Sequence, residues 1–194
     1  MCVSVGALAK TRRSTPPVPA PAETLQAHSD LPLGLMNKVA LRFKKNVFPG
    51  ELSEGLRQQR SGPRGMSYIT RLWGSNVALG ASAGALAHER EAAGEAAAID
   101  FALGELAQML GNDVKRLFDR GAATAWAADP FSRGAYSHCL PGRYGARELL
   151  TRPVGERIVF AGEHTEQSAY GTLHGAHLSG LRAARQVVEL LRQA

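Results

Sequence analysis

The C-terminal part of the sequence contains the feature that most constrains the fold: a short apolar run, a glycine-rich turn and a long helix. Residues 158–161 are apolar and end at Gly162, and residues 172–192 have a helical pattern with small residues in its first turns. The apolar run predicts a short buried strand. Small residues at the helix start let a flat group or another backbone approach closely, and the free N–H groups there favour an anion. The spacing fits equally well a strand–turn–helix unit in which the small residues serve only packing.

The N-terminal part of the sequence predicts two strands on either side of a proline-rich segment. Residues 2–8 have strand character, and residues 38–43 alternate apolar and polar side chains as a half-buried strand does. Four prolines exclude a helix from residues 10–21, because proline fixes φ and removes a backbone donor. Residues 23–31 are expected to form one or two helical turns.

The middle of the sequence predicts a hairpin followed by a helix. Residues 49–65 are rich in glycine, proline and polar groups and predict a loop, whereas residues 66–73 and 76–81 predict two strands joined by a hairpin turn. Residues 85–110 predict a long helix that is broken at Gly94. Apolar residues at helical spacing predict its buried face: Ile99, Ala102, Leu103, Leu106 and Leu110.

Composition excludes several classes of protein. A chain of 194 residues that is 44% hydrophobic and 21% charged is typical of one or two folded domains. The net charge is +6, but the basic residues are scattered and aromatic residues make up only 6%, so no nucleic-acid partner is expected. We expect no membrane span, because no apolar run is long enough, and no signal peptide. Cys2 and Cys139 lack the spacing of a disulfide framework, which predicts a cytoplasmic protein.

Two stretches near the C-terminus resemble a known family. Residues 159–165 read VFAGEHT and residues 170–184 read YGTLHGAHLSGLRAA. Together they resemble the C-terminal signature of the flavin-containing amine oxidase family, which includes monoamine oxidases, polyamine oxidases and lysine-specific histone demethylases. Further segments resemble the family in the same order: 3–8 its V-P-x-G-x-L strand, 16–21 the proline segment after it, 33–43 the strand with its flavin-side lysine, and 126–137 its W-x-x-D-P-x-x-x-G-x-Y-S segment.

The resemblance implies three catalytic residues. Lys38 matches the lysine that holds a water against flavin N5, although composition alone favours an ordinary exposed strand lysine. Tyr136 matches an aromatic wall of the cage that steers the substrate nitrogen. Thr172 falls where family members place the second cage residue or a flavin contact, and a threonine there argues against a cage of two tyrosines.

The resemblance also implies a set of cofactor-binding residues. Trp126 matches a tryptophan beside the isoalloxazine, with an ordinary core aromatic as the alternative. Glu163 matches the carboxylate that accepts hydrogen bonds from the ribitol or sugar hydroxyls of the cofactor. Gly162, Thr172 and Gly175 complete the expected contacts with the flavin. No metal-ligand spacing appears, so no metal is expected.

The implied reaction is the oxidation of a C–N bond in a small-molecule amine to an imine, with FAD as cofactor and O₂ reduced to H₂O₂. The sequence departs from the family in lacking the G-x-G-x-x-G fingerprint. Because that pattern cradles the pyrophosphate, the chain is expected to need a complementing N-terminal chain. The alternative is a catalytically inactive remnant or an interaction module of the same family.

The expected fold class is mixed α/β, with the N-terminal half of the family fold missing. Residues 1–9 and 125–194 are expected to form part of a Rossmann-like FAD-binding domain. Residues 10–124 are expected to form a sheet-and-helix substrate-binding domain.

Overall fold

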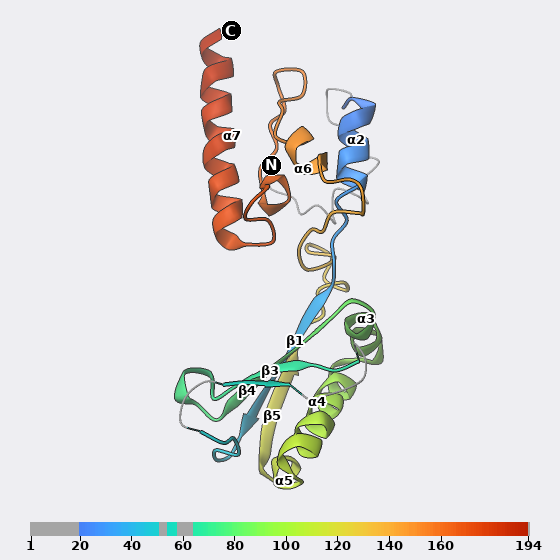
Figure 1. Ribbon diagram of the computed structural model, residues 1–194, viewed down its shortest axis with the longest axis vertical. Helices are drawn as coiled ribbons and strands as arrows, with labels where there is room; N and C mark the ends of the chain where they lie inside the picture. Colours follow the sequence, from blue (N-terminus) through green and yellow to red (C-terminus); the bar gives the residue numbers. More distant parts are fainter. Residues whose placement is uncertain (1–19, 51–53, 58–63, 194) are drawn as a thin grey trace. The chain divides into compact units, whose positions relative to one another are not determined.

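The computed structural model describes residues 20–50, 54–57 and 64–193. The chain divides into two compact units: unit 1, made of Met1–Gly34 and Pro130–Ala194, and unit 2, made of Leu35–Asp129. The strand predicted over residues 2–8 lies outside the described residues. The mixture of helices and strands expected from the sequence is confirmed (Figure 1).

Unit 2 is built on a five-stranded antiparallel sheet in the order β2-β3-β4-β1-β5. Its strands are β1 (Met36–Phe43), β2 (Glu54–Arg57), β3 (Ser67–Thr70), β4 (Val77–Ala83) and β5 (Phe118–Ala123). Along β1, Val39, Leu41 and Phe43 are buried while Lys38 and Arg42 are exposed, so the predicted alternation is confirmed. The predicted hairpin is also confirmed, because β3 and β4 are consecutive antiparallel neighbours.

Helices α3 (Gly84–Ala93), α4 (Glu95–Leu110) and α5 (Asp113–Leu117) follow β4 and pack beside the sheet (Figure 1). Gly94 separates α3 from α4 at φ 92°, a left-handed conformation that favours glycine, so the predicted break is confirmed. Ala102, Leu103 and Leu106 of α4 are buried against β1 and β3 in the main core cluster. Burial of this face is what holds the helix to the sheet.

The structure corrects two predictions in unit 2. The range 49–65, predicted as a loop, contains β2, which pairs with β3 from Glu54 opposite Thr70 to Arg57 opposite Ser67. The strand predicted over 66–73 stops at Thr70, and Leu72–Gly74 form a 3₁₀ turn with Trp73 at φ 51°. Both differences arise because strand pairing is decided by neighbouring strands, and short polar segments carry little periodic signal.

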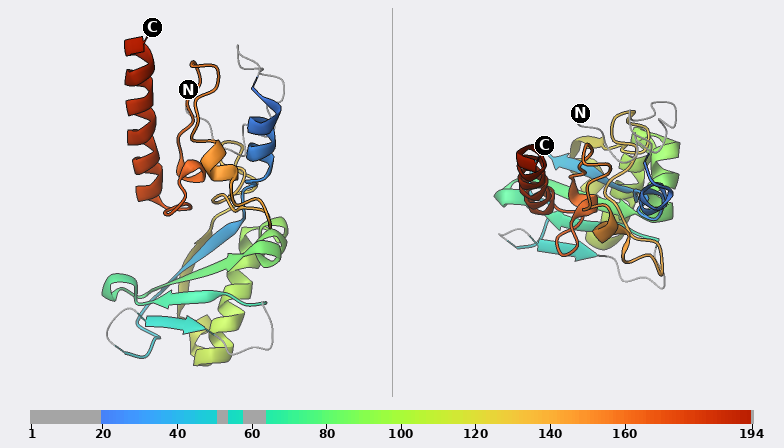
Figure 2. Two further views of the ribbon diagram at one scale, coloured as in Figure 1. Left: turned by 45° about the horizontal axis from the view of Figure 1, so that its top comes forward. Right: turned by 90° about the horizontal axis from the view of Figure 1, so that it is seen from above.

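Unit 1 contains α2 (Ala22–Ser29), the short helix α6 (Ala146–Leu149), the 3₁₀ turn η2 (Glu163–Thr165) and the long helix α7 (Leu173–Gln193). The helices predicted over 23–31 and 172–192 are therefore confirmed. Within the unit, α6 lies between α2 and α7 (Figure 2). A small core of Ala27, Leu31, Ala146 and Leu150 joins α2 to α6.

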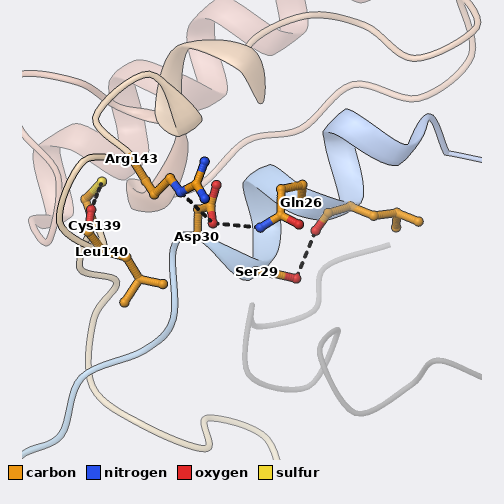
Figure 3. Close-up of polar contacts among 7 residues, drawn as sticks. Gln26, Ser29, Asp30, Cys139, Leu140 and Arg143 are labelled. Atoms are coloured by element: carbon orange, nitrogen blue, oxygen red, sulfur yellow. Dashed lines mark hydrogen bonds and ion pairs between the residues drawn. The ribbon is translucent and has the colours of Figure 1, made fainter.

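Polar contacts fix the C-terminal end of α2 (Figure 3). The buried carboxylate of Asp30 accepts a hydrogen bond of 2.8 Å from Gln26 Nε2, and Arg143 Nε lies 3.7 Å from the same oxygen. Ser29 Oγ donates to the carbonyl of Leu25. Cys139, a free thiol, donates from Sγ to the carbonyl of Leu140 at 3.4 Å.

The strand predicted over residues 158–161 is not formed. Ile158 makes a single isolated bridge with Val154, and residues 158–160 are only half-buried. A strand needs a neighbour for its N–H and C=O groups, and the described part of unit 1 contains only this bridge and one between Leu33 and Ser137. The turn at residues 162–165 is present as η2.

Helix α7 packs on its unit through a narrow stripe of small and polar residues. Gly175 and Ser179 are buried, and Arg182 donates to the carbonyls of Thr151 and Phe160. Six of the large apolar residues of α7 remain exposed, among them Leu173 at 89% and Leu191 at 72%. Further exposed members are Leu178, Leu181, Val187 and Val188. This arrangement leaves an apolar surface of α7, formed by these six residues, without a covering element in the described part of unit 1.

Candidate functional site

In unit 1, the carboxylate of Glu163 binds two segments that lie far from each other in the sequence. Its Oε1 accepts a hydrogen bond from the Ser137 N–H at 2.8 Å. Its Oε2 accepts from Ser137 Oγ at 2.9 Å and from the Gly171 N–H at 2.8 Å. Glu163 thus joins η2 to the segment before α6 and to the segment before α7.

Arg147 completes this cluster from the other side. Its side chain is buried, with 4% exposure, and it donates to Ser137 Oγ at 2.8 Å and to the carbonyl of His164 at 3.1 Å. The hydroxyl of Ser137 therefore accepts from the guanidinium and donates to the carboxylate of Glu163, so it bridges two opposite charges. The guanidinium also lies over the ring of Tyr170, 4.3 Å from its centroid.

Tyr136 and Thr172 lie next to this cluster. The ring of Tyr136 is 41% exposed and packs near Gly171, where an added Cβ would lie 3.3 Å from Cδ2 of the ring. The hydroxyl of Thr172 donates to the carbonyl of Ala169 and accepts from the Gly175 N–H at 3.1 Å. Thr172 therefore caps the first turn of α7.

The two glycines of the predicted cofactor set are required by the chain itself. Gly162 has φ 130°, its N–H donates to Ser179 Oγ, and an added Cβ would lie 2.8 Å from Nδ1 of His164. At Gly175 an added Cβ would lie 2.0 Å from the carbonyl oxygen of Ala169. The close approach predicted at the start of α7 is thus made by the chain's own backbone, the packing alternative that the spacing left open.

His164 is a buried neutral histidine beside this cluster. Its pKa is lowered to about 4, chiefly by burial and in part by the neighbouring charges of His28, Arg147 and Arg182, while Glu163 opposes the shift. The ring of His28 lies 6.0 Å from that of His164, and burial lowers the pKa of His28 as well. These surroundings agree with a structural role for His164.

Acidification is expected to destabilise the folded chain through His164. Between about pH 6.5 and about pH 4 the unfolded chain binds a proton at this residue and the folded chain does not, so stability is complete above the unfolded pKa and falls by about 3 kcal/mol towards pH 4. Urea unfolding across this range measures the slope. His164→Asn should flatten it, whereas the same change at the exposed His174 should leave it unchanged; equal slopes in both variants would contradict the assignment.

In unit 2, Lys38 and Trp126 occupy neighbouring segments. Lys38 lies on β1 opposite Ala81 of β4, and its side chain is exposed, as expected for an ordinary strand lysine. Its N–H donates to Thr124 Oγ1 at 2.9 Å, and the Thr124 N–H donates back to the carbonyl of Lys38 at 2.9 Å. Trp126 follows two residues later and is 41% exposed, so it is not a core aromatic.

The predicted site residues thus fall in two groups. Unit 1 brings together Tyr136, Gly162, Glu163, Thr172 and Gly175, and unit 2 brings together Lys38 and Trp126. Sequence reasoning missed the roles of Ser137 and Arg147. Ser137 lies within a motif segment, which was a usable signal, but no pattern distinguishes Arg147 from the other scattered basic residues.

In the described residues, no group of three or more histidine, cysteine, aspartate or glutamate side chains is placed to hold a metal ion. Nor is any helix in this part of the chain both long and apolar enough to cross a bilayer. For a flavin, the exposed aromatic rings of Trp126 and Tyr136 and the exposed amine of Lys38 are chemically suitable contacts.

Known proteins match this chain over most of its length. A model of the family described as flavin containing amine oxidoreductase matches residues 1–188. Lysine-specific histone demethylase 1 homolog 2 of Oryza sativa subsp. japonica is 32% identical over 87% of this chain and 23% of its own length. Polyamine oxidase 2 of Arabidopsis thaliana is 33% identical over 82% of this chain and 32% of its own length. A possible lysine-specific histone demethylase 1 of Drosophila melanogaster is 31% identical over 88% of this chain and 21% of its own length. The chain therefore spans a third or less of the length of these relatives.

Proposed function

This chain belongs to the family of flavin-containing amine oxidoreductases, and on that premise we propose that it takes part in the oxidation of an amine C–N bond to an imine. A bound FAD would accept the two electrons and the hydrogen of the α-carbon, the amine nitrogen would release a proton, and O₂ would take up the two electrons and two protons as H₂O₂. The substrate is a small-molecule amine. The proposed compartment is the cytoplasm, because the two cysteines lack the spacing of a disulfide framework.

The observation that carries this proposal is the convergence of the family motifs on Glu163. Its carboxylate accepts hydrogen bonds from Ser137 of one motif and from Gly171 of another, while Glu163 itself lies in a third. The three motifs resemble those of a single site in the family, and their direct contact here supports a shared role. In this proposal Gly162, Glu163, Thr172 and Gly175 contact the cofactor.

Each remaining residue has a separate role in the proposal. Lys38 holds a water against flavin N5, and its exposed amine can donate the hydrogen bond that this requires. Trp126 packs beside the isoalloxazine, and Tyr136 presents its exposed ring to the substrate nitrogen, together with Thr172.

Residues 1–9 and 125–194 belong to a Rossmann-like FAD-binding domain, and residues 10–124 to the substrate-binding domain.

We also propose that an N-terminal chain complements this one. The apolar surface of α7 supports this, because exposed apolar side chains on one helix face are stabilised when another element covers them.

A specific observation favours the inactive remnant as a second candidate. Both carboxylate oxygens of Glu163 already accept hydrogen bonds from the protein, and the carbonyl of Ala169 occupies the approach to Gly175. A site that satisfies its own polar groups gains less from a ligand.

Titration of the purified chain with FAD separates the two candidates. Binding should quench Trp126 fluorescence and give a bound flavin spectrum, and a peroxide-coupled screen of amines then tests oxidation. A chain that leaves the spectrum and the fluorescence unchanged at saturating FAD, alone and with an N-terminal chain from a relative, would contradict the proposal and support the remnant.

Variants then test the assigned roles. Lys38→Met should slow flavin reduction by about 100-fold or more with FAD affinity unchanged, because only a polarising group is lost. Glu163→Ala should weaken FAD retention instead. The matched control is Arg42→Met, which changes a second exposed cation on β1 and should alter neither property. A normal reduction rate in Lys38→Met would remove that assignment.

A further inference from the structure

Asn37 connects three elements of unit 2 through one buried amide. It lies on β1 next to Lys38 and is 4% exposed. Its Nδ2 donates to Oε2 of Glu91 at 2.6 Å, while its Oδ1 accepts from Thr124 Oγ1 at 3.0 Å and from the Trp126 N–H at 3.2 Å. The side chain is therefore oriented by hydrogen bonds at both ends, and it reaches α3 on one side and the segment that carries Trp126 on the other.

Glu91 binds the same segment at the two residues that follow Trp126. Its Oε1 accepts from the Ala128 N–H at 2.6 Å, and its Oε2 accepts from the Ala127 N–H at 3.3 Å as well as from Asn37. Glu91 lies in the last turn of α3, where the helix dipole disfavours a negative charge. The hydrogen bonds from the Trp126 segment offset that cost, so they account for a carboxylate at this position.

Lys38 is held by the same set of contacts. Thr124 donates to Asn37 through Oγ1, accepts from the Lys38 N–H through the same oxygen, and donates its own N–H to the Lys38 carbonyl. The backbone of Lys38 and the backbone of Trp126 therefore share one network. A substitution that breaks this network is therefore expected to shift the Trp126 segment relative to Lys38.

We propose that Asn37 and Glu91 are positioning residues, which hold the Trp126 segment against β1 and so set Trp126 and Lys38 in the arrangement that a bound flavin requires. This inference rests on the proposed function for its purpose, but the network itself exists in the free protein. The two parts can therefore be tested separately.

A reversal of the hydrogen bond between the two side chains tests the network. In Asn37→Asp two carboxylates face each other. In Glu91→Gln the one amide oxygen can accept from Asn37 Nδ2 or from the Ala128 N–H but not from both, and the NH₂ group then faces another donor, so each single variant loses a contact of the network. In the double variant the new amide donates to the new carboxylate, and the net charge equals that of the unsubstituted chain. The double variant should therefore recover what each single variant loses.

The readouts report on Trp126 directly. A Trp73→Phe background leaves Trp126 as the single tryptophan, because the chain contains two. In each single variant we expect the Trp126 and Ala128 amides to exchange about tenfold faster and acrylamide to quench Trp126 more strongly, with recovery in the double variant. Glu89→Gln is the matched control, since Glu89 is 40% exposed on the same helix and should leave both readouts unchanged.

FAD affinity is then measured on four proteins: the unsubstituted chain, the two single variants and the double variant. The singles should bind FAD at least about tenfold more weakly and the double variant should bind as the unsubstituted chain does. Unchanged exchange and quenching in the singles, or a double variant no better than the singles, would overturn the positioning role. If exchange recovers in the double variant but no protein binds FAD, the network stands and the proposed function fails.

Discussion

Gly175→Ala should destabilise unit 1 by about 3 kcal/mol or more, the upper end of the cost of overpacking. The added Cβ would lie 2.0 Å from the carbonyl oxygen of Ala169 and 2.8 Å from its carbonyl carbon, which are backbone atoms with no freedom to rotate away. The start of α7 would have to separate from the segment before it, and the contact of Glu163 with the Gly171 N–H would be lost with it. Urea unfolding followed by circular dichroism, with amide exchange along α7 as the local probe, measures the effect.

Gly180→Ala provides the control for this prediction. Gly180 lies in the same helix, and an added Cβ would meet no atom within 4 Å. Alanine is a better helix former than glycine, so this variant should be more stable by about 0.5–1 kcal/mol. Two variants with the same sign and size of effect would show that the approach at Gly175 is not as close as the structure has it.

Arg147→Met should cost about 3 kcal/mol of stability, because it removes a buried cation while its acceptors stay in place. The carbonyls of Ser137 and His164 would lose their donor, and the Ser137 hydroxyl would no longer link Glu163 to a positive charge. The variant should also weaken the retention of FAD, since the Ser137 hydroxyl that donates to Glu163 would lose the guanidinium that donates to it. Thermal and urea unfolding measure the first effect, and titration with the cofactor measures the second.

Arg143→Met is the matched substitution at an exposed site. Arg143 is 59% exposed and its Nε lies 3.7 Å from Asp30, a separation at which an ion pair contributes no more than about 1 kcal/mol. We expect a small loss of stability and no change in FAD retention. If Arg147→Met lowered the free energy of unfolding as little as Arg143→Met, the contacts of Glu163, Ser137 and Arg147 would not be a main source of the stability of unit 1.

The candidate site was predictable only where a motif carried it. Tyr136, Glu163 and Thr172 could be selected because each lies within a long segment that resembles the family. Arg147 lies outside these segments, and Asn37 lies inside the segment 33–43, but the roles of both arise from partners that are distant in the sequence and so could not be predicted. Asn37, for example, bonds to Glu91, which is 54 residues away.

The secondary structure likewise divides into elements that the local sequence determines and elements that depend on distant residues. The alternation of Val39, Leu41 and Phe43, and the glycine at position 94, determine a strand and a helix break locally, through burial period and backbone freedom. Whether residues 158–161 pair with a strand, and whether residues 54–57 become one, depends on the neighbour that is available. By itself, the sequence determined the family and the local elements of this protein. The tertiary structure alone decided which strands pair, that Glu163 accepts hydrogen bonds from two other motif segments, and that Arg147 is linked to it through Ser137. Hydrogen bonds between residues far apart in the chain produce no periodic pattern in the sequence, so they could not be predicted from it.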